Sequence, residues 1–561
     1  MSVLTSLWRD GWLRNVDHAL ALSLRHARED SSDWLLAAVA LASRALGNGH
    51  SRLPLARAAA FFAEIDASRV APILPPLDEW LAILAVSPWV FDAGATNGTF
   101  ASGRSEFVLV LEGDAISLRR YHDYECRLAS ALLRRARAGS RLQLLTGGPG
   151  TGKTTQVARL IVEFSQSASA STATTIAAPP RILLAAPTGK AASRLSESVR
   201  ESLAVQVQAG ELDGTTAASL PTQASTLHRM LGWQRGGGFR HDHDHPLPAD
   251  LVVVDEASMV DLPMMCKLVE AVAPDALLVL VGDRDQLPSV ETGDVLAALC
   301  EASEAAGSPL SSCRTHLTHS HRQGEDVDVL ELARLVRDGD APRAMDGLAQ
   351  GSFRGVSWRN EGDHGLHDGL LAQALPAYRS LPDAPDVATA LQRAREFRIL
   401  CAVREGPSGS ATINALVNRA LDPLRGGQGW FRGHLLLVTE NSYRQQLFNG
   451  DIGIAWPDEQ GEMRAWFDTD TGPRAWLPAA IPAHESAFAM TVHKAQGSEF
   501  GQVAFVLPER GARVISRELL YTGLTRCRRA VTLWATEDVL REGIACRAQR
   551  WSGLAERLGS T

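Results

Sequence analysis

The sequence predicts an α/β protein with two units built on parallel sheets, a helical N-terminal unit and a small β insertion. The first observation is a glycine-rich loop between a short apolar strand and a helix, over residues 141–164. The second is a series of short apolar strands that alternate with helical segments from Arg141 onward. The third is a similar pattern that starts near Phe397–Val403 and resumes at Met490–Leu507. A chain of 561 residues has room for roughly three or four units of ordinary size.

Residues 1–118 are expected to form the helical unit, because Ala, Leu and Trp recur in them with helical spacing. Asp30-Ser31-Ser32 predicts the start of one helix, and Gly47-Asn48-Gly49 predicts its end. Phe107–Leu111 and Ala115–Leu118 predict a hairpin that closes the unit. We find no catalytic group of side chains here and interpret the unit as a packing or docking module.

Residues 119–345 are assigned to the first α/β unit. Its predicted strands are Leu142–Leu145, Ile182–Ala186, Leu251–Val254 and Leu277–Val281, and residues 167–180 and 236–245 read as surface insertions. Residues 346–561 are assigned to the second unit. Between its strands, residues from about 429 to 482 contain short strands with Gly and Asp turns, which indicates a small β-barrel insertion.

The charge, the cysteine pattern and the lack of long apolar runs bear on the partners and the location of the protein. With 56 basic and 64 acidic residues the formal charge is −8, so a nucleic-acid partner would have to be held by local positive charge in a groove. The seven cysteines are scattered without a Cys-x-x-Cys pair, which predicts reduced thiols and neither a disulfide framework nor a zinc site. The sequence shows no bilayer-length apolar run and no apolar signal region, so we expect a cytoplasmic protein without membrane contact.

The glycine-rich loop is a complete phosphate-binding motif and predicts ATP as the cofactor. Its glycines let backbone N–H groups close on phosphate oxygens at the start of the next helix. Lys153 is expected to neutralise the β- and γ-phosphates, and the Thr154 hydroxyl to hold Mg²⁺. The residues assigned to this nucleotide site are Gly147, Gly148, Pro149, Gly150, Thr151, Gly152, Lys153, Thr154 and Thr155.

Two further strand ends carry the chemistry of ATP hydrolysis. Asp255 and Glu256 follow an apolar strand, where Asp255 can hold Mg²⁺ and Glu256 can polarise the attacking water. Gln286 follows the next predicted strand, and its amide can hydrogen-bond both water and the γ-phosphate. An acidic pair or a polar loop is often structural, but the full phosphate loop in the same sheet favours the catalytic interpretation.

Two arginines are candidates for contacting the γ-phosphate across a domain cleft. They are Arg322, in Thr318–Gln323, and Arg526, in Thr522–Arg529. A guanidinium is always protonated and stabilises charge that develops on a transferred phosphoryl group. Taken singly, either residue is more often a plain surface arginine, and spacing does not decide between the two interpretations.

Three segments suit a strand of nucleic acid better than a nucleotide. Pro187 and Thr188 follow a strand and open a helix, whose N–H groups can take a backbone phosphate. Hydroxyl, imidazole and cationic groups mix in residues 225–229 and 491–499, which suits phosphate contacts and base stacking without sequence readout. The DNA-contact candidates are Pro187, Thr188, Thr226, His228, Thr491 and His493, and Glu499 at the end of the last segment is assigned to the nucleotide site.

One histidine-rich loop remains. His241, His243 and His245 alternate with aspartates, which could indicate metal binding. Such an alternation in a Gly-rich loop is more often a solvated turn.

In this order, the segments resemble the characteristic motifs of superfamily-1 helicases and, more specifically, those of the RecD family, the alpha subunit of exodeoxyribonuclease V. The match runs over nearly the whole chain. Its most specific pieces are the phosphate loop, Ala186–Ala192, Ser225–Leu231, Val252–Met265, Gly282–Pro288, Leu400–Pro407, Leu447–Ile454, Ala489–Phe500 and Arg517–Arg529.

The resemblance implies two RecA-like P-loop motor domains, an SH3-like form for the β insertion, and contact with RecC through the N-terminal unit. It implies an ATP-dependent translocase on single-stranded DNA and a 5′-to-3′ DNA helicase, working with RecB and RecC on broken double-stranded DNA for recombination. In that family the nuclease centre belongs to RecB, and we find no second acidic cluster here that would suggest one.

The sequence departs from the family before the phosphate loop, where relatives usually carry a longer segment with a Gln that reads adenine. Here Arg119–Glu125 leads through one helix, Cys126–Arg137, to the strand at Arg141, without a Gln. Adenine selectivity is therefore left open, with Tyr121 or Tyr124 as a candidate stacking partner. Two alternatives also stay open: a structural or regulatory subunit with weak ATPase, and a stand-alone helicase of the same group.

Overall fold

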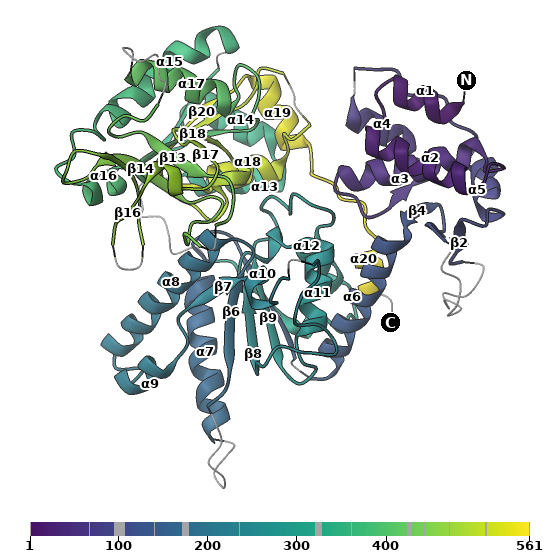
Figure 1. Ribbon diagram of the computed structural model, residues 1–561, viewed down its shortest axis with the longest axis horizontal. Coiled ribbons are helices and arrows are strands. Elements are labelled where there is room, and N and C mark those ends of the chain that lie inside the picture. The colour runs from purple at the N-terminus through teal and green to yellow at the C-terminus, as the bar shows by residue number, and fades with distance from the viewer. Residues whose placement is uncertain are drawn as a thin grey trace.

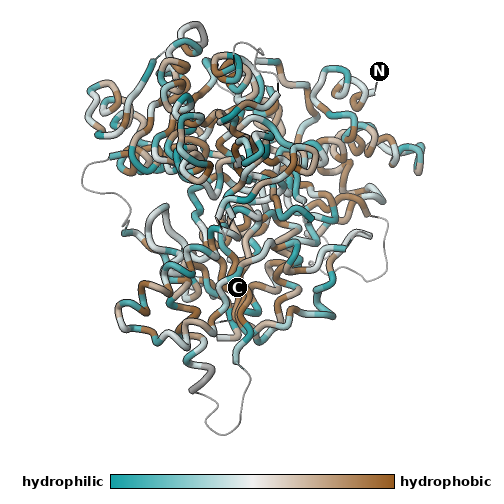
Figure 2. The backbone as a smooth tube through the Cα atoms, turned by 60° about the vertical axis from the view of Figure 1, so that its left-hand side comes forward, coloured by the Kyte–Doolittle hydropathy of each residue, from teal (hydrophilic) through white to brown (hydrophobic). Residues whose placement is uncertain are grey.

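The computed structural model describes residues 2–66, 68–94, 107–139, 141–170, 179–234, 236–319, 328–360, 362–422, 429–442, 444–469, 472–510 and 513–559. Two α/β units lie one above the other in Figure 1, and the N-terminal unit lies beside them. Hydrophobic segments gather inside each unit, as the brown stretches of the tube in Figure 2 show. Among the described residues, no helix combines the length and apolar character needed to cross a membrane.

The N-terminal unit packs five helices against a small sheet of order β1-β4-β3-β2. Ser32 caps α3 through its Oγ, which accepts from Trp34 N–H, and Leu35–Ala42 are buried at the centre of the unit. The antiparallel pair β3–β4 is the predicted hairpin. The elements are α1 (Val3–Arg9), α2 (Asn15–Ala27), α3 (Asp33–Gly47), β1 (Leu53–Pro54), α4 (Ala58–Ile65), α5 (Leu77–Ala85), β2 (Val90–Asp92), β3 (Leu109–Glu112) and β4 (Ala115–Leu118).

The first motor unit has a six-stranded parallel sheet of order β10-β5-β9-β8-β6-β7. All four predicted strands are present in it, as β5, β6, β8 and β9. Alternate residues of β8 and β9 pack on α6, α11 and α12 on one face and on α7 and α8 on the other. The elements are α6 (Arg119–Arg137), β5 (Leu142–Gly147), α7 (Lys153–Ala170), β6 (Ile182–Ala186), α8 (Gly189–Gln208), α9 (Gly214–Ser219), β7 (Ala224–Thr226), α10 (Leu227–Met230), β8 (Leu251–Val254), α11 (Leu262–Ala271), β9 (Leu277–Gly282), α12 (Val295–Glu304) and β10 (Arg314–Leu317).

The second motor unit has a five-stranded parallel sheet of order β11-β20-β19-β12-β18. Its strands and helices share one continuous core. The elements are α13 (Val329–Asp338), α14 (Ala341–Ala349), β11 (Val356–Arg359), α15 (Asp363–Arg379), α16 (Val387–Ala394), β12 (Phe397–Cys401), α17 (Ser410–Leu421), β18 (Ala489–Thr491), β19 (Phe500–Val506), α18 (Arg517–Leu524), β20 (Cys527–Trp534) and α19 (Glu537–Ala545).

The β insertion is a five-stranded antiparallel sheet of order β16-β15-β14-β13-β17. Its strands are β13 (Leu435–Val438), β14 (Ile452–Pro457), β15 (Met463–Phe467), β16 (Arg474–Trp476) and β17 (His484–Ser486), so the sheet reaches past residue 482. The pairings of the described residues leave β16 and β17 as its edges, and the SH3-like form stays a prediction.

The predicted unit boundaries need two corrections. The buried residues of α13 and α14 belong to the core of the second motor unit, so the division between the motor units lies before Val329 rather than at residue 345. The chain end also leaves the second unit: α20 (Leu554–Gly559) packs on α6 and α12 of the first, with Leu554 and Leu558 in that core. Long-range packing decides both points, and local sequence patterns do not record it.

The segment before the phosphate loop also differs from the expectation. Arg119–Glu125 is the first part of α6 and not a connection that precedes a helix. The predicted insertion at residues 167–180 is part of α7 up to Ala170, and residues 171–178 lie outside the described part of the chain.

Candidate nucleotide site and strand groove

The phosphate loop connects β5 to α7 in the predicted strand–loop–helix order. Gly150 and Gly152 have φ angles of 74° and 79°, a region that glycine enters without steric cost. The Lys153 ammonium donates to the carbonyls of Gly147 and Gly148 at 2.7 and 2.8 Å, across the mouth of the loop. Thr154 and Thr155 lie in the first turn of α7, so the loop presents its N–H groups at a helix N-terminus.

Gly147 is needed for a close approach. A Cβ there would lie 2.7 Å from Thr151 Oγ1 and 2.8 Å from the carbonyl oxygen of Leu317 on β10. Thr151 Oγ1 itself donates to Gly148 O at 2.9 Å, which fixes the turn that contains Pro149. The glycine-rich sequence therefore packs the loop against its neighbouring strand as well as allowing its turns.

Asp255 and Glu256 follow β8 and face the phosphate loop from the middle of the sheet. Glu256 adopts a left-handed conformation with φ 52°, which is uncommon for a residue with a side chain and typical of functional sites. Its N–H donates to Asp255 Oδ1 at 2.8 Å. Burial and the charge of Glu256 raise the pKa of Asp255, while Lys153 acts in the opposite direction. The pair therefore forms an acidic centre that lacks full compensating charge.

Gln286 lies in the loop after β9, and its side chain is 6% exposed. Its Nε2 donates to Asp283 Oδ2 at 3.2 Å, and the Tyr521 hydroxyl of the second motor unit donates to the same oxygen at 3.1 Å. Leu287 N–H donates to Thr522 Oγ1 at 2.9 Å. The loop that carries Gln286 is thus bonded across the cleft to α18.

The structure describes one of the two candidate arginines for the γ-phosphate. Arg322 lies outside the described residues. Arg526 is 3% exposed, and its guanidinium donates to Thr522 O at 3.2 Å and Ser498 O at 3.4 Å, both within the second motor unit. Both of these acceptors are backbone carbonyls of its own motor unit, and the contact of Arg526 with phosphate stays a prediction.

Glu499, whose contact with the nucleotide stays a prediction, binds two arginines. Its carboxylate accepts from Arg194 of α8 at 2.8 Å and from Arg528 at 3.3 Å, and the side chain is 6% exposed. Arg194 also donates to the carbonyl of Gly497 at 3.1 Å. These contacts join α8 of the first motor unit to the second, a role that sequence order did not reveal.

The first predicted DNA-contact segment opens α8. Thr188 Oγ1 accepts from Ala191 N–H at 3.2 Å and so caps the helix next to Pro187. Gly189 lies against Phe448 of the β insertion, whose ring carbon would be 2.4 Å from a Cβ at this position. The start of α8 therefore faces the insertion across the cleft.

The second segment lies at the end of β7, the edge strand beside β6. Thr226 caps α10 by accepting from Arg229 N–H at 3.3 Å, and burial lowers the pKa of His228. The His228 ring lies 5.9 Å from that of Phe239, and nearby Trp233 is 55% exposed. An exposed tryptophan beside an imidazole suits base stacking, a feature that the sequence reading did not single out.

The third segment follows β18, the edge strand of the other sheet. Thr491 Oγ1 accepts from Lys494 N–H at 3.4 Å, and burial lowers the pKa of His493. The order of the strands in the two sheets places the predicted site residues on two different sets of loops. The loops after β5, β8 and β9 carry the nucleotide-site candidates from Gly147 to Gln286, whereas those after β6, β7 and β18 carry the DNA-contact candidates together with Glu499.

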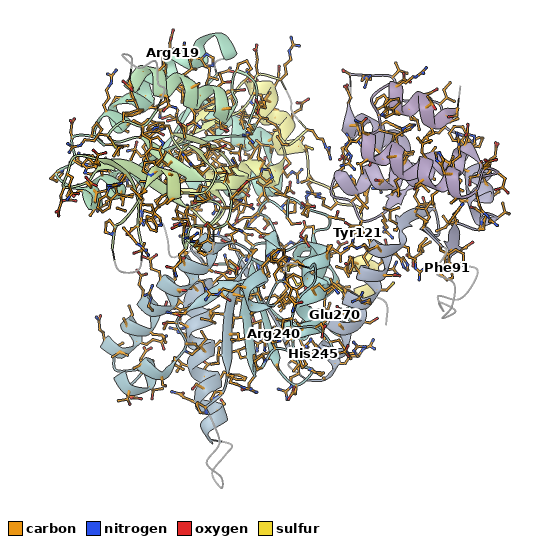
Figure 3. The ribbon with its side chains drawn as sticks, in the orientation of Figure 1. Phe91, Tyr121, Arg240, His245, Glu270 and Arg419 are labelled. Atoms are coloured by element: carbon orange, nitrogen blue, oxygen red, sulfur yellow. The ribbon has the colours of Figure 1, made fainter. Side chains whose placement is uncertain are left out.

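The histidine-rich loop is a turn. The carboxylate of Asp242 accepts from the backbone N–H groups of Asp244 and His245, and His243 and His245 are exposed. Figure 3 shows His245 and Arg240 on the outside of the first motor unit. Within the described part of the chain no group of His, Cys, Asp or Glu side chains is arranged to hold a metal ion.

The two tyrosines before the phosphate loop have other partners. Tyr121, labelled in Figure 3 on α6, points to Thr292, and burial raises its pKa. Tyr124 lies beneath the guanidinium groups of Arg120 and Arg127, at 5.6 and 5.8 Å from its ring centre. These contacts give both rings packing roles on α6 and do not support the stacking expectation.

Comparison with known proteins matches three parts of the chain. These are the N-terminal domain of RecBCD enzyme subunit RecD over residues 9–114, an AAA domain over 131–292 and a UvrD-like helicase C-terminal domain over 486–534. The chain is 38% identical to the RecBCD enzyme subunit RecD of Mycolicibacterium smegmatis over 560 residues, covering 93% of both chains.

Further relatives follow the same pattern. The RecBCD enzyme subunit RecD of Mycobacterium tuberculosis is 41% identical over 425 residues, which cover 74% of this chain and 71% of that protein. The ATP-dependent RecD2 DNA helicase of Deinococcus radiodurans is 34% identical over 70% of this chain and 46% of its own length. A structure of Bacteroides Pif1 bound to ssDNA aligns with a TM-score of 0.37 at 16% identity, covering 73% of this chain and 93% of that one. That score is too low to bear on function.

Proposed function

We infer the function from the premise that the chain belongs to the family of the RecBCD enzyme subunit RecD. It is an ATP-dependent DNA helicase subunit. We propose that it moves along single-stranded DNA in the 5′-to-3′ direction, and that it works with RecB and RecC on broken double-stranded DNA in recombination. The nuclease activity of that assembly is assigned to RecB.

The observation that carries the proposal is the bonding of the Gln286 loop across the cleft. Asp283 accepts from Tyr521, and Leu287 N–H donates to Thr522 Oγ1, both on α18. Loss of the γ-phosphate would therefore alter the position of the Gln286 loop, and the hydrogen bonds from this loop to Tyr521 and Thr522 would transmit the shift to the second motor unit. Since the DNA-contact segments lie on both units, each change in the cleft shifts one set of contacts relative to the other.

Hydrolysis would proceed by positioning rather than by covalent chemistry. Lys153 would leave the carbonyls of Gly147 and Gly148 to neutralise the β- and γ-phosphates. Glu256 would orient the attacking water and accept its proton, and Gln286 would hydrogen-bond that water and the γ-phosphate. Arg526 and Arg322 stay candidates for charge stabilisation at the γ-phosphate.

We propose Mg²⁺ as the metal ion, held by Thr154 and Asp255. The donor set suits it, because a hydroxyl and a carboxylate are hard oxygen ligands. A cation would also add to the partial charge compensation that Lys153 and Arg194 give to Asp255 beside Glu256. When bound, Mg²⁺ supplies charge neutralisation at the β- and γ-phosphates.

Single-stranded DNA would lie across the loops after β6, β7 and β18. Pro187 and Thr188 would offer the helix N-terminus of α8 to a phosphate, and Thr226, His228, Thr491 and His493 would contact the strand further along. The exposed Trp233 adds a surface on which a base can stack. Because the net charge of the chain is −8, the strand would have to be held by local positive charge rather than by a broadly basic surface. We place the protein in the cytoplasm, in keeping with its seven free cysteines.

One alternative is favoured by a specific observation. The segment from Arg119 to the strand at Arg141 contains no Gln, and Tyr121 and Tyr124 are engaged elsewhere. A site that lacks an adenine contact could bind ATP weakly, and the chain would then act mainly as a structural subunit.

The test is steady-state ATP hydrolysis by the purified chain, with and without single-stranded DNA and with GTP as competitor. Lys153→Ala should abolish DNA-stimulated hydrolysis, by at least about a hundredfold, while the thermal unfolding midpoint stays unchanged, because the side chain bonds only to two loop carbonyls. Retained turnover in Lys153→Ala would contradict the assignment. A folded wild-type chain that hydrolyses no ATP but joins its partners would support the structural alternative.

A further inference from the structure

The turn that follows α3, residues Leu46–His50 of the N-terminal unit, lies against the loop that carries Gln286. Gly293 N–H donates to Gly49 O at 2.9 Å, and Thr292 Oγ1 donates to Leu46 O at 3.3 Å. Thr292 is buried at 4% exposure. The N-terminal unit is therefore bonded directly to the segment just downstream of Gln286.

Arg550 lies between this turn and the same loop. Its Nη1 donates to Asn48 O at 2.9 Å, and its Nη2 donates to Ser289 O at 3.1 Å. Gly49 has φ 91°, and a Cβ there would lie 0.8 Å from Arg550 Nη1. The guanidinium thus fills the space that a side chain at residue 49 would take, and it bridges two backbone carbonyls from distant parts of the chain.

The turn also contacts the second motor unit. Arg513 Nη1 donates to Asn48 Oδ1 at 2.8 Å, and its Nη2 donates to Glu64 Oε1 at 2.9 Å. On the far side of the loop, Leu287 is bonded to Thr522 of that unit. Three parts of the molecule therefore contact one another pairwise: the Leu46–His50 turn, the loop from Gln286 to Gly293 and the second motor unit.

We propose that Arg550 is a positioning residue for ATP hydrolysis, which holds the Ser289–Gly293 loop against the N-terminal unit and thereby couples that unit to the placement of Gln286. The inference rests on the proposed function, because it takes Gln286 to act at the γ-phosphate. The planar fork of a guanidinium can donate to two fixed carbonyls at once, a geometry that a lysine ammonium on a flexible stem does not reproduce.

The test is the hydrolysis of ATP by full-length Arg550 variants at saturating single-stranded DNA. Arg550→Ala should lower kcat roughly tenfold and leave KM for ATP within about twofold, because the phosphate loop is untouched. Arg550→Lys should recover only part of the loss. An unchanged kcat in Arg550→Ala would overturn the proposal.

Arg557→Ala is the matched control. Arg557 lies in the same C-terminal segment and binds Glu112 and Glu125, away from the Ser289–Gly293 loop. It should keep the wild-type kcat, and an equal loss in both variants would show that loosening of the segment, not Arg550, is the cause. If Arg550→Ala does not fold, Thr292→Val removes the bond to Leu46, together with the contact to the Tyr121 hydroxyl, and should still lower kcat at constant KM.

Hydrogen exchange gives a second readout. A non-hydrolysable ATP analogue should slow exchange of the Leu46–His50 amides in the wild type and leave them unaffected in Arg550→Ala. No change in the wild type on analogue binding would contradict the coupling. Wild-type activity keeps the two ideas apart: an inactive wild type contradicts the proposed function, whereas an active wild type with an unaffected Arg550 variant contradicts the coupling alone.

Discussion

Tyr521 crosses the cleft between the motor units with a single hydroxyl. This hydroxyl donates to Asp283 and also lies close to Gly148 of the phosphate loop. If residue 148 had a Cβ, that atom would lie 3.0 Å from the Tyr521 oxygen. Burial and the neighbouring charge of Asp283 raise the pKa of Tyr521 well above its ordinary value. The phenol therefore stays a neutral hydrogen-bond donor at neutral pH, and its hydroxyl lies beside the phosphate loop.

His434 shows how burial sets the charge of one side chain. The residue is 6% exposed, and its ring lies parallel to those of Phe431 and Phe488, at centroid distances of 4.8 and 5.7 Å. Its Nε2 lies 2.8 Å from Ser486 Oγ, and its Nδ1 is buried. Burial lowers the pKa of His434 to about 4, so the folded chain keeps the imidazole neutral.

We predict that His434 makes the fold acid-sensitive. Because protons bind this residue more tightly in the unfolded chain, its contribution to stability is present above pH 6.5 and is lost as the pH falls toward 4. The loss should reach about 3 kcal/mol. His434→Phe keeps the stack and removes the proton site, so the difference in unfolding free energy between the two proteins, measured in urea, should change with pH over this window. A constant difference would contradict the prediction.

Among the secondary-structure elements, α20 lies in a position that its local sequence does not predict. It is short and terminal, yet Leu558 and Leu554 are 0% and 1% exposed in the core of the first motor unit. Arg557 anchors it to Glu112 at the end of β3. The element therefore links the second motor unit, which the chain has just left, to both other units.

Leu558→Ala should destabilise the first motor unit by about 2–4 kcal/mol, because a buried leucine leaves a cavity when truncated. Glu556→Ala is the control on the same helix: its side chain is 69% exposed and pairs with Arg52, so we expect a change below about 1 kcal/mol. Urea unfolding of both variants measures the contrast. Equal effects would mean that α20 frays in solution and contributes little.

Across the whole molecule, most of the cysteine thiols are kept from solvent. Five of the seven cysteines are buried, Cys126 is half-buried and Cys546 is exposed. Burial raises the pKa of Cys266 and of Cys527 to about 12 each. That these thiols are reduced and unpaired in solution stays a prediction.

We predict that a charged thiol reagent labels Cys546 rapidly in the native protein and that all seven cysteines react after unfolding without reductant. Mass spectrometry of the modified peptides identifies the sites. Rapid labelling of Cys401 or Cys300 in the native state would show that the cores open readily. Fewer than seven reactive thiols after unfolding would reveal a bond between two of them.

Local patterns determined most of the first motor unit. The strands β5, β6, β8 and β9 and the loops after them were predictable, because apolar runs bounded by glycine, carboxylate and amide residues report a buried parallel strand and its functional end directly. The hairpin β3–β4 and the start of α3 followed from turn and capping residues for the same reason.

Tertiary structure alone decided which of these ends meet and what bonds them. Four contacts join residues that are far apart in the chain. They are the bond of Tyr521 to Asp283, the binding of Glu499 by Arg194, the packing of α20 on the first motor unit and the packing of Arg550 against Gly49. Such pairs leave no periodic trace in a sequence, since their partners are chosen by the packing of whole units. The sequence by itself determined the chemical groups of the motor, and the fold determined how they are connected.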